Sequence, residues 1–185
     1  MTSVMDAIQI ATQEFPDIID DPVTQKFIAR TKKHVDLVNK YAARIGQSYP
    51  EHDSSKFTLL LPGYRYMIKP ANERTVEETK ALDLATYLHI TQASHHAEYW
   101  TKDKEGLKAF TRANPNPTGV IDCTDMPQEC IDEMICDWCA TAEEKNGNPF
   151  DWFESVNGIR WKFNESQQMY IRLLIDKVWN GSEKI

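Results

Sequence analysis

Apolar residues recur along most of the chain at the three- and four-residue spacing of amphipathic α-helices. The longest such stretch follows Asp21-Pro22, an N-cap residue with proline at the first helical position, and Gly46 offers a C-terminal stop. This pattern predicts one long helix over about residues 23–45. Its apolar stripe consists of Phe27, Ile28, Val35, Val38, Tyr41, Ala42 and Ile45.

Capping residues indicate where the other helices begin. Thr75 and Glu78 form a capping box in front of a helix that is expected to end near Ala93. Asn164 and Gln167 form an equivalent pair in front of the last helix. Three further helices are expected at about residues 53–61, 127–144 and 149–156.

Two segments depart from this helical pattern. Residues 102–126 are rich in Asn, Pro, Gly and Thr and predict a loop whose length is unusual in a compact domain unless it covers or lines a site. Tyr64 to Ile68 is the only candidate strand, and it follows Pro62-Gly63, where the helix over about 53–61 is expected to end. The whole pattern predicts an all-α fold: a single-domain helical bundle of six to seven helices over residues 1–185, with its core between about residues 22 and 180.

Composition and charge narrow the class of protein. The chain has 185 residues, of which 41% are hydrophobic and 26% charged, and these proportions exclude wholesale disorder. Its net charge of −7 gives no basis for bulk nucleic-acid binding or for adhesion to an anionic membrane. No apolar run is long enough to span a membrane, and the N-terminal segment lacks the order of a secretory signal. We therefore expect a cytoplasmic protein whose four cysteines stay reduced.

Histidines are the residues of chemical interest. The chain has five, and three of them lie between His89 and His96. His34 lies on the apolar stripe of its predicted helix and His89 on the inward face of its own, so both are expected to point inward. His52 and Asp53 are adjacent in the sequence and follow a polar loop. His95, His96 and Asp137 complete the set. Of the two adjacent histidines one is expected to face inward, and the sequence leaves open which one.

Imidazole and carboxylate groups on separate helices suit a divalent transition metal: Mn, Fe, Co, Ni or Zn, as one ion or two. Each ligating histidine must then stay neutral and be oriented by a further acceptor. The competing interpretation is that the histidines never meet, because a lone inward histidine is more often a hydrogen-bonded core residue. The Cys136-x-x-Cys139 spacing has no second pair to match it, so it predicts buried apolar cysteines rather than a zinc or redox site.

The order His34, His52-Asp53, Asp137 resembles the H…HD…D motif of the HD-domain superfamily of metal-dependent phosphohydrolases, which is all-helical. A closer resemblance, over about residues 30–160, is to a family of small phage and bacterial proteins with HD-x-SKF and HH-x-x-YW motifs. The matching pieces are HVDLV at 34–38, HDSSKF at 52–57, HITQASHHAEYW at 89–100, MPQE at 126–129, MICDW at 134–138 and WFE at 152–154. The chain departs after Phe57, where TLLLPGYRYM stands in place of a short S-P-x-E-F turn.

The resemblance implies roles for these residues. It implies that a first metal is held by His34, His52, Asp53 and Asp137, with Asp53 bridging to a second ion where one is present. It implies that His89 ligates this second ion and that His95 and His96 either ligate it or donate to a phosphate oxygen. The expected catalytic residues are Asp53, Lys56, His95 and His96, and the expected substrate contacts are Lys56, Arg30 and Tyr99.

Each expected substrate contact has an alternative interpretation. Lys56 and Arg30 also fit surface cations that pair with carboxylates, and Tyr99 also fits a core or lid residue beside Trp100. For the function we expect a cytoplasmic enzyme that hydrolyses a small nucleotide or another phosphomonoester. If the chain is phage-encoded, its location is the host cytoplasm. A homo-oligomer is compatible with this function. The alternatives are a di-iron oxygenase on the same scaffold, or a non-catalytic phage protein that binds a host nucleotide or host factor.

Overall fold

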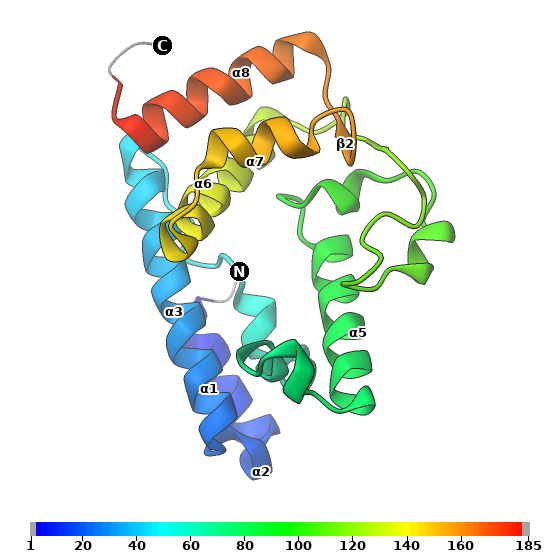
Figure 1. Cartoon of the computed structure of the whole chain (residues 1–185). Helices are drawn as coiled ribbons and strands as arrows, with labels where there is room; N and C mark the ends of the chain where they lie inside the picture. The colour runs from blue at the N-terminus through cyan, green and yellow to red at the C-terminus, as the bar shows by residue number, and fades with distance from the viewer. Residues whose placement is uncertain (1–2, 183–185) are drawn as a thin grey trace.

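The computed structural model describes residues 3–182 and is built mainly of helices (Figure 1). The predicted all-α class is confirmed, with eight α-helical segments in the described part of the chain. The three longest are α3 (Pro22–Ala42), α5 (Val76–Gln92) and α6 (Gln128–Lys145). The others are α1 (Val4–Glu14), α2 (Pro16–Ile19), α4 (Leu61–Tyr64), α7 (Pro149–Val156) and α8 (Glu165–Ile175).

Short turns of tighter or wider helix connect these segments. The 3₁₀ turns are η1 (Ala43–Ile45), η2 (Ser54–Phe57), η3 (Arg65–Ile68), η4 (Ala71–Glu73), η5 (Ala97–Trp100) and η6 (Gly106–Ala109). A π turn, η7 (Asp176–Asn180), extends α8. Two parallel strands of two residues each, β1 (Ile121–Asp122) and β2 (Trp161–Lys162), pair beside α7. No helix of the described residues is long and apolar enough to cross a membrane.

The predicted caps set the boundaries of the longer helices. The Asp21 side chain accepts from the Val23 N–H at the start of α3, and Gly46 ends the following η1 turn at φ 71°, a conformation that glycine adopts without steric cost. Thr75 and Glu78 make both hydrogen bonds of the expected capping box in front of α5. The helices predicted over about 23–45, 127–144 and 149–156 are confirmed as α3 with η1, α6 and α7.

The N-terminal segment is helical, which was not predicted from the sequence. The apolar residues of α1 follow the spacing of an amphipathic helix, and its inner face includes two small residues, Ala7 and Ala11, whose side chains are fully buried. Val4 and Ile19 complete this face, and all four belong to the same core as Phe57. The core therefore begins well before residue 22.

The segment after Asp53 differs most from its prediction. A helix over about 53–61 was expected, but the chain forms the η2 turn and then α4, so Pro62-Gly63 lies inside a helical turn rather than ending one. Proline is accommodated because the first turn of a helix needs no N–H from it. Gly63 is required because a Cβ there would lie 2.7 Å from the Cβ of Ala85 on α5. Tyr64 to Ile68 is helical, so the candidate strand was wrong.

The buried apolar residues form two main cores that meet along α3. Val35 belongs to the core shared with α1, α4 and α5, and Val38 belongs to the core shared with α6, α7 and α8. The cysteines at positions 136 and 139 are buried in the second core without a disulfide, as predicted. Residues 102–126 are mostly irregular, as expected, and Leu107 and Phe110 anchor them on Ile90 of α5. The candidate residues lie where the two cores meet.

Candidate metal centre

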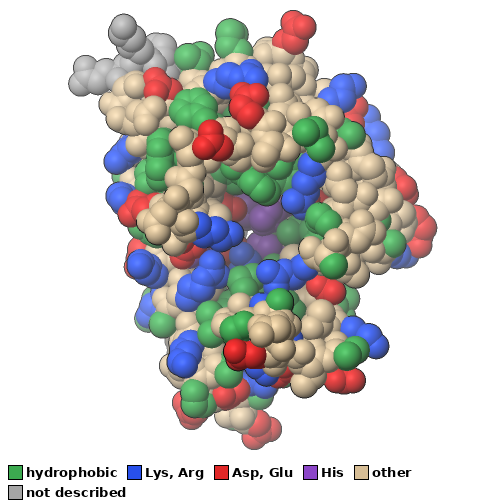
Figure 2. Space-filling view, viewed as in Figure 1, with side chains coloured by type: hydrophobic (Ala, Val, Ile, Leu, Met, Phe, Trp, Pro, Cys, Tyr) green, Lys and Arg blue, Asp and Glu red, His purple; other side chains and the backbone are tan. Residues whose placement is uncertain are grey.

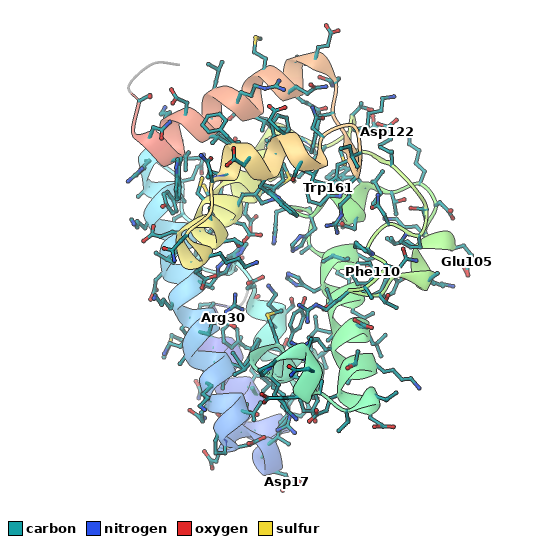
Figure 3. All side chains as sticks on the ribbon, viewed as in Figure 1. Asp17, Arg30, Glu105, Phe110, Asp122 and Trp161 are labelled. Carbon is teal, nitrogen blue, oxygen red and sulfur yellow. The ribbon has the colours of Figure 1, made fainter. Side chains whose placement is uncertain are left out.

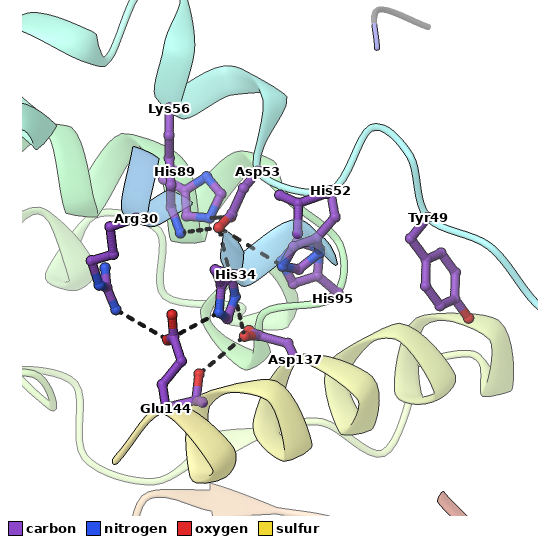
Figure 4. A network of polar contacts seen from close by, with 12 residues as sticks. Arg30, His34, Tyr49, His52, Asp53, Lys56, His89, His95, Asp137 and Glu144 are labelled. Atoms are coloured by element: carbon purple, nitrogen blue, oxygen red, sulfur yellow. Dashed lines mark hydrogen bonds and ion pairs between the residues drawn. The ribbon is translucent and has the colours of Figure 1, made fainter. Parts of the chain in front are cut away.

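All five histidines and two aspartates come together between α3, α5 and α6. Figure 4 shows both aspartates with four of these histidines, His34, His52, His89 and His95. They arrive from five places along the chain, so no single helix face could have displayed them together. His34 comes from α3, His52 and Asp53 from the loop before η2, His89 from α5, His95 and His96 from the segment after α5, and Asp137 from α6. The histidines therefore meet, which removes the interpretation that folding alone accounts for each of them.

The backbone at Asp53 turns sharply to deliver two of these side chains. Asp53 has φ 62° and ψ 8°, in the left-handed region that Asp and Asn tolerate best after glycine. Its side chain is only 1% exposed, and that of the neighbouring His52 is fully buried. Strained backbone of this kind persists where the surrounding structure holds it, and it is common at functional sites.

A first group of ligand-type atoms surrounds one oxygen of Asp53. Its Oδ2 lies 3.9 Å from His34 Nε2 and 3.8 Å from His52 Nε2, and His34 Nε2 lies 3.0 Å from Asp137 Oδ1. Two ligands of one ion with bonds near 2.1 Å lie about 3–4 Å apart. The spacing of these atoms is therefore that of a single ion's ligands.

A second group surrounds the other oxygen of Asp53. Its Oδ1 lies 3.0 Å from His89 Nε2, which in turn lies 3.0 Å from His96 Nε2. One ring nitrogen each from His89, His95 and His96 lies within 4.8 Å of the others, and His95 also groups with His52 and Asp53. The Asp53 carboxylate thus lies between two groups of imidazoles, the position that the resemblance to HD-domain enzymes implies for a bridging ligand.

Both His95 and His96 face this cluster, although they are adjacent in sequence. They were expected at the end of the helix, where neighbouring residues point about 100° apart. Instead α5 ends at Gln92, and His96 has an extended backbone with φ −94° and ψ 137°. The two rings lie side by side with their centroids 4.3 Å apart.

Carboxylates on α6 orient three of the rings through their Nδ1 atoms. Glu133 Oε1 lies 2.8 Å from His52 Nδ1 and 3.1 Å from His95 Nδ1. Glu144 Oε2 lies 3.2 Å from His34 Nδ1. An ionised carboxylate only accepts hydrogen bonds, so each Nδ1 carries the proton and Nε2 is the atom left to bind a ligand.

These orienting residues were missed from the sequence, although a signal existed. Glu133 precedes Asp137 by four residues and therefore lies on the same face of α6. Glu144 follows Asp137 by seven residues, again on that face. The His89 Nδ1 atom lies 3.0 Å from the Ser55 hydroxyl, which belongs to the HD-x-SKF motif itself.

Unpaired buried atoms show that the residues fit a metal ion. His52 Nε2, His95 Nε2 and Asp53 Oδ1 are buried without a hydrogen-bond partner in the described part of the chain. The 3.0 Å contact of Asp53 Oδ1 with His89 lacks hydrogen-bond alignment. Leaving such a group unsatisfied costs about 1–3 kcal/mol. Because the atoms are imidazole nitrogens and a carboxylate oxygen, the donor set suits Mn, Fe, Co, Ni or Zn.

The charges in the cluster favour ionised carboxylates. Burial opposes ionisation of Asp53, but Lys56 and His52 outweigh it and hold the pKa of Asp53 well below its usual range. Burial opposes ionisation of Asp137 as well, and the hydrogen bond from His34 lowers its pKa in the same way. Glu133 is partly buried, which opposes its ionisation, yet hydrogen bonds from His52 and His95 lower its pKa to about 2.

The imidazole pKa values depend on their different partners. Burial disfavours the charged form of His34, but hydrogen bonds to Asp137 and Glu144 raise its pKa to about 9. Burial, with Lys56 nearby, lowers the pKa of His89 to about 4. His89 is therefore neutral at neutral pH, as a ligand must be.

A small cationic cavity opens onto the first group. It has a volume of about 220 Å³ and is bounded by His34, Asp53 and Asp137 on one side. Figure 2 shows histidine at the bottom of a hollow with Lys and Arg side chains around it. The cations that line the cavity are Arg30, Lys56, Arg112 and Lys145. Of these, Arg112 and Lys145 were not predicted, although Arg112 comes from the long loop that was expected to line a site.

The two predicted cations take part in ion pairs as well as lining the cavity. Lys56 Nζ lies 2.7 Å from Asp53 Oδ2, and its side chain is 16% exposed. Arg30 Nη2 lies 3.3 Å from Glu144 Oε2, and its side chain is 39% exposed. Both interpretations of these residues therefore apply together: each pairs with a carboxylate and each faces the cavity.

Tyr99 is the one predicted site residue that the structure does not bring to the cluster. Its ring packs edge-on against Trp100 and lies beneath the Lys104 ammonium. It lines none of the three cavities that contain the histidines. The helix ends at Gln92, close to its predicted end, and the segment that follows leaves Tyr99 37% exposed.

We expect Glu133→Gln to lower the affinity for a divalent metal by roughly 10- to 100-fold. Both Nδ1–H groups point at the same carboxylate oxygen, Oε1. A neutral glutamine oxygen is a weaker acceptor than an ionised carboxylate, so both rings lose the charged partner that fixes the proton on Nδ1 and makes Nε2 a good ligand. Competition with a chelating dye measures the affinity. Glu129→Gln, an exposed position on the same helix, is the matched control, and equal affinities of the two variants would contradict this role.

The chain matches a family model over residues 24–177, which include every residue of the cluster. The model is described as a family of unknown function, DUF5662. No curated protein and no solved structure is significantly similar to the chain. Because the match covers most of the sequence, the chain belongs to the DUF5662 family of unknown function.

Proposed function

We propose that the protein is a metal-dependent phosphohydrolase of HD type that acts on a small phosphorylated substrate. The proposal rests on the observation that three candidate metal ligands, His34, Asp53 and Asp137, line the same cavity as four cationic side chains. Metal ligands and cations on one small cavity are what phosphoryl transfer requires, because the substrate is an anion whose charge must be neutralised during reaction.

The residues assigned to a metal are those of the two groups around Asp53. His34, His52, Asp53 and Asp137 would hold the first ion, and the imidazoles beyond Asp53 would hold a second. Such an ion, when bound, polarises a phosphoryl oxygen and lowers the pKa of a coordinated water. The second group consists of His89, His95 and His96.

The remaining chemistry falls to the side chains that face the cavities. Arg30 and Lys56 are held in place by carboxylates, so they are suited to fix the position of a phosphate. Arg112 and Lys145 are exposed and are suited to recruit it. His96 faces the larger neighbouring cavity beside Asp137 and is the imidazole best placed to donate a hydrogen bond to a substrate oxygen. The net charge of −7 does not oppose this, because the local charge of the cavity is positive.

Phosphate release tests the proposal directly. Protein purified without chelator and supplied with Mn²⁺, Co²⁺ or Ni²⁺ is expected to release phosphate from at least one member of a broad phosphomonoester panel. Chelator is expected to abolish the release. Metal-loaded protein that binds phosphorylated ligands tightly but releases no phosphate would instead support the non-catalytic binding alternative.

We expect Lys145→Ala and Arg112→Ala each to raise KM by about tenfold, because an ionic hydrogen bond to phosphate contributes about 1.5 kcal/mol or more when partly desolvated. The metal content should not change, since neither side chain contacts the cluster. Lys102→Ala, a largely exposed lysine paired with Asp125, is the matched control. A KM unchanged in both cavity variants would show that phosphate does not bind in this cavity.

A second candidate function is oxygenation by a di-iron site on the same scaffold. The observation that favours it is the group of three additional imidazoles on the far side of Asp53, which a mononuclear hydrolase does not need. This function predicts two iron ions per chain after growth with iron, a visible absorption band and oxygen consumption. Iron-free protein that is active with Mn²⁺ would argue against it.

A further inference from the structure

A second, larger cavity opens beside the cationic one. It has a volume of about 720 Å³, within the range of small-molecule sites, whereas the cationic cavity of about 220 Å³ holds little more than a phosphoryl group. The two cavities share three wall residues, Asp137, Thr141 and Lys145. A substrate whose phosphoryl group lies in the smaller cavity therefore extends the rest of its structure into the larger one.

The larger cavity has an aromatic wall. Trp138 and Trp161 stack with their centroids 5.7 Å apart, and Trp152 meets Trp161 edge-on at 6.1 Å. Trp152 is 41% exposed and lines the cavity, so part of its ring is open to a ligand, whereas Trp161 is buried and its ring is contacted by Trp138 and Arg160. Phe110 adds a fourth ring from the long loop, away from β2 where Trp161 lies (Figure 3). An exposed indole face such as that of Trp152 favours a planar ring, which stacks on it.

A fixed guanidinium gives this wall its polarity. Arg160 Nη2 donates to Glu98 Oε1 at 2.9 Å, and the same oxygen accepts from Trp161 Nε1 at 3.3 Å. Glu98 is only 2% exposed, so the pair is built into the fold. Arg160 lies over the Trp161 ring and lines the cavity, and its Nε is buried. Its side chain is 24% exposed, so the outer nitrogens of the guanidinium have donors left for an acceptor on a ligand.

These features discriminate between kinds of substrate. An aliphatic or sugar phosphate would leave the exposed face of Trp152 uncovered. A planar heterocycle with acceptor atoms on its edge satisfies both this face and the Arg160 guanidinium.

We propose that the larger cavity binds a nucleobase, so that the substrate is a nucleoside monophosphate rather than an aliphatic phosphoester. This inference rests on the proposed function for the phosphoryl end of the substrate, but not for the binding of the base. The base stacks on the exposed face of Trp152 beside Arg160, and the phosphate lies in the cationic cavity.

Two measurements on the full chain test the inference. In the first, the four common nucleosides, which lack phosphate, are titrated against the protein by tryptophan fluorescence and calorimetry. At least one is expected to bind, and Trp152→Ala should weaken it roughly tenfold, while Trp152→Phe should retain most of the affinity. Ile159→Ala, at another largely exposed apolar residue outside the cavity, is the control. Absence of nucleoside binding, or equal binding by Trp152→Ala, overturns the inference whether or not the protein is a hydrolase.

The second measurement compares hydrolysis of the matching nucleoside 5′-monophosphate with that of glycerol 3-phosphate. Trp152→Ala should raise KM roughly tenfold for the nucleotide and leave KM for glycerol 3-phosphate unchanged. Equal effects on both substrates, or a preference for glycerol 3-phosphate, would overturn the base-binding role while leaving phosphohydrolase activity intact. Nucleoside binding without hydrolysis of either ester would keep the base site and reject the proposed function.

Discussion

Asp53→Asn is expected to lower the affinity for divalent metal by at least about 100-fold and to reduce phosphate release to background. The loss follows from geometry, because each oxygen of Asp53 faces one of the two groups of imidazoles. Asparagine is the right replacement, since it tolerates the left-handed backbone at φ 62°. Alanine would add roughly 1–2 kcal/mol of backbone strain and confound the result.

Controls for this variant follow from its neighbours. Asp36→Asn makes the same change of charge at an exposed position of α3, two residues from His34, and should keep its metal. Asp53→Asn also leaves the Lys56 ammonium without its ion pair. The double variant Asp53→Asn/Lys56→Gln restores the charge balance and should still lack metal. Elemental analysis of protein purified without chelator measures each case, and stoichiometric metal in Asp53→Asn would reject the assignment of Asp53.

Metal loading is expected to raise the melting temperature by about 5–11 °C. An ion that binds only the folded chain, at a free concentration 100 times its Kd, stabilises it by about 2.7 kcal/mol. For a domain of this size each kcal/mol corresponds to roughly 2–4 °C. The physical source is the set of buried nitrogen and oxygen atoms that have no partner in the described residues and that an ion would satisfy.

Scanning calorimetry in the presence of each divalent ion, followed by excess chelator, measures this shift. Mg²⁺ serves as a control, because it prefers oxygen ligands and should stabilise an imidazole-rich site much less than Mn²⁺, Co²⁺ or Ni²⁺. Asp53→Asn should show no shift with any of them. If the melting temperature of the wild-type protein does not change with any transition metal, the assignment of a metal centre is contradicted.

The helices that could be predicted from the sequence are those whose signals act locally. A capping box such as Thr75 with Glu78 makes its hydrogen bonds within one turn, so pattern and structure agree. The α1 helix was missed although its apolar residues are spaced as in an amphipathic helix and the Ser3 side chain caps it, so a local signal was present. The turn after Asp53 was misjudged because its shape depends on contact between Gly63 and α5, which is distant in sequence.

The residues of the candidate site also fall into those that local sequence patterns could predict and those that depend on contacts between distant segments. The residue types were recognised from motifs, and the prediction that His34 and His89 point inward is confirmed by their burial. Glu133 could be placed on the face of Asp137 from its spacing, but its orienting role depends on rings from two other segments, which that spacing does not show. Arg112 could not be assigned, since an irregular loop carries no periodicity that fixes where its side chains point. Tyr99 lies outside the cluster because the chain leaves α5 at Gln92 and exposes it, and no local pattern indicates the path of that segment.

The packing of α1 has a practical consequence for where this protein can be cut. The family match begins at residue 24, which leaves α1 and α2 outside it. Yet α1 packs against η2, the turn that directly follows Asp53, and shares a core with Phe57. A chain trimmed to the matched region would expose the underside of that turn to water, with no second layer to hold the left-handed backbone in place. For expression or engineering, the working unit therefore includes the N-terminal helix, even though the family pattern does not reach it.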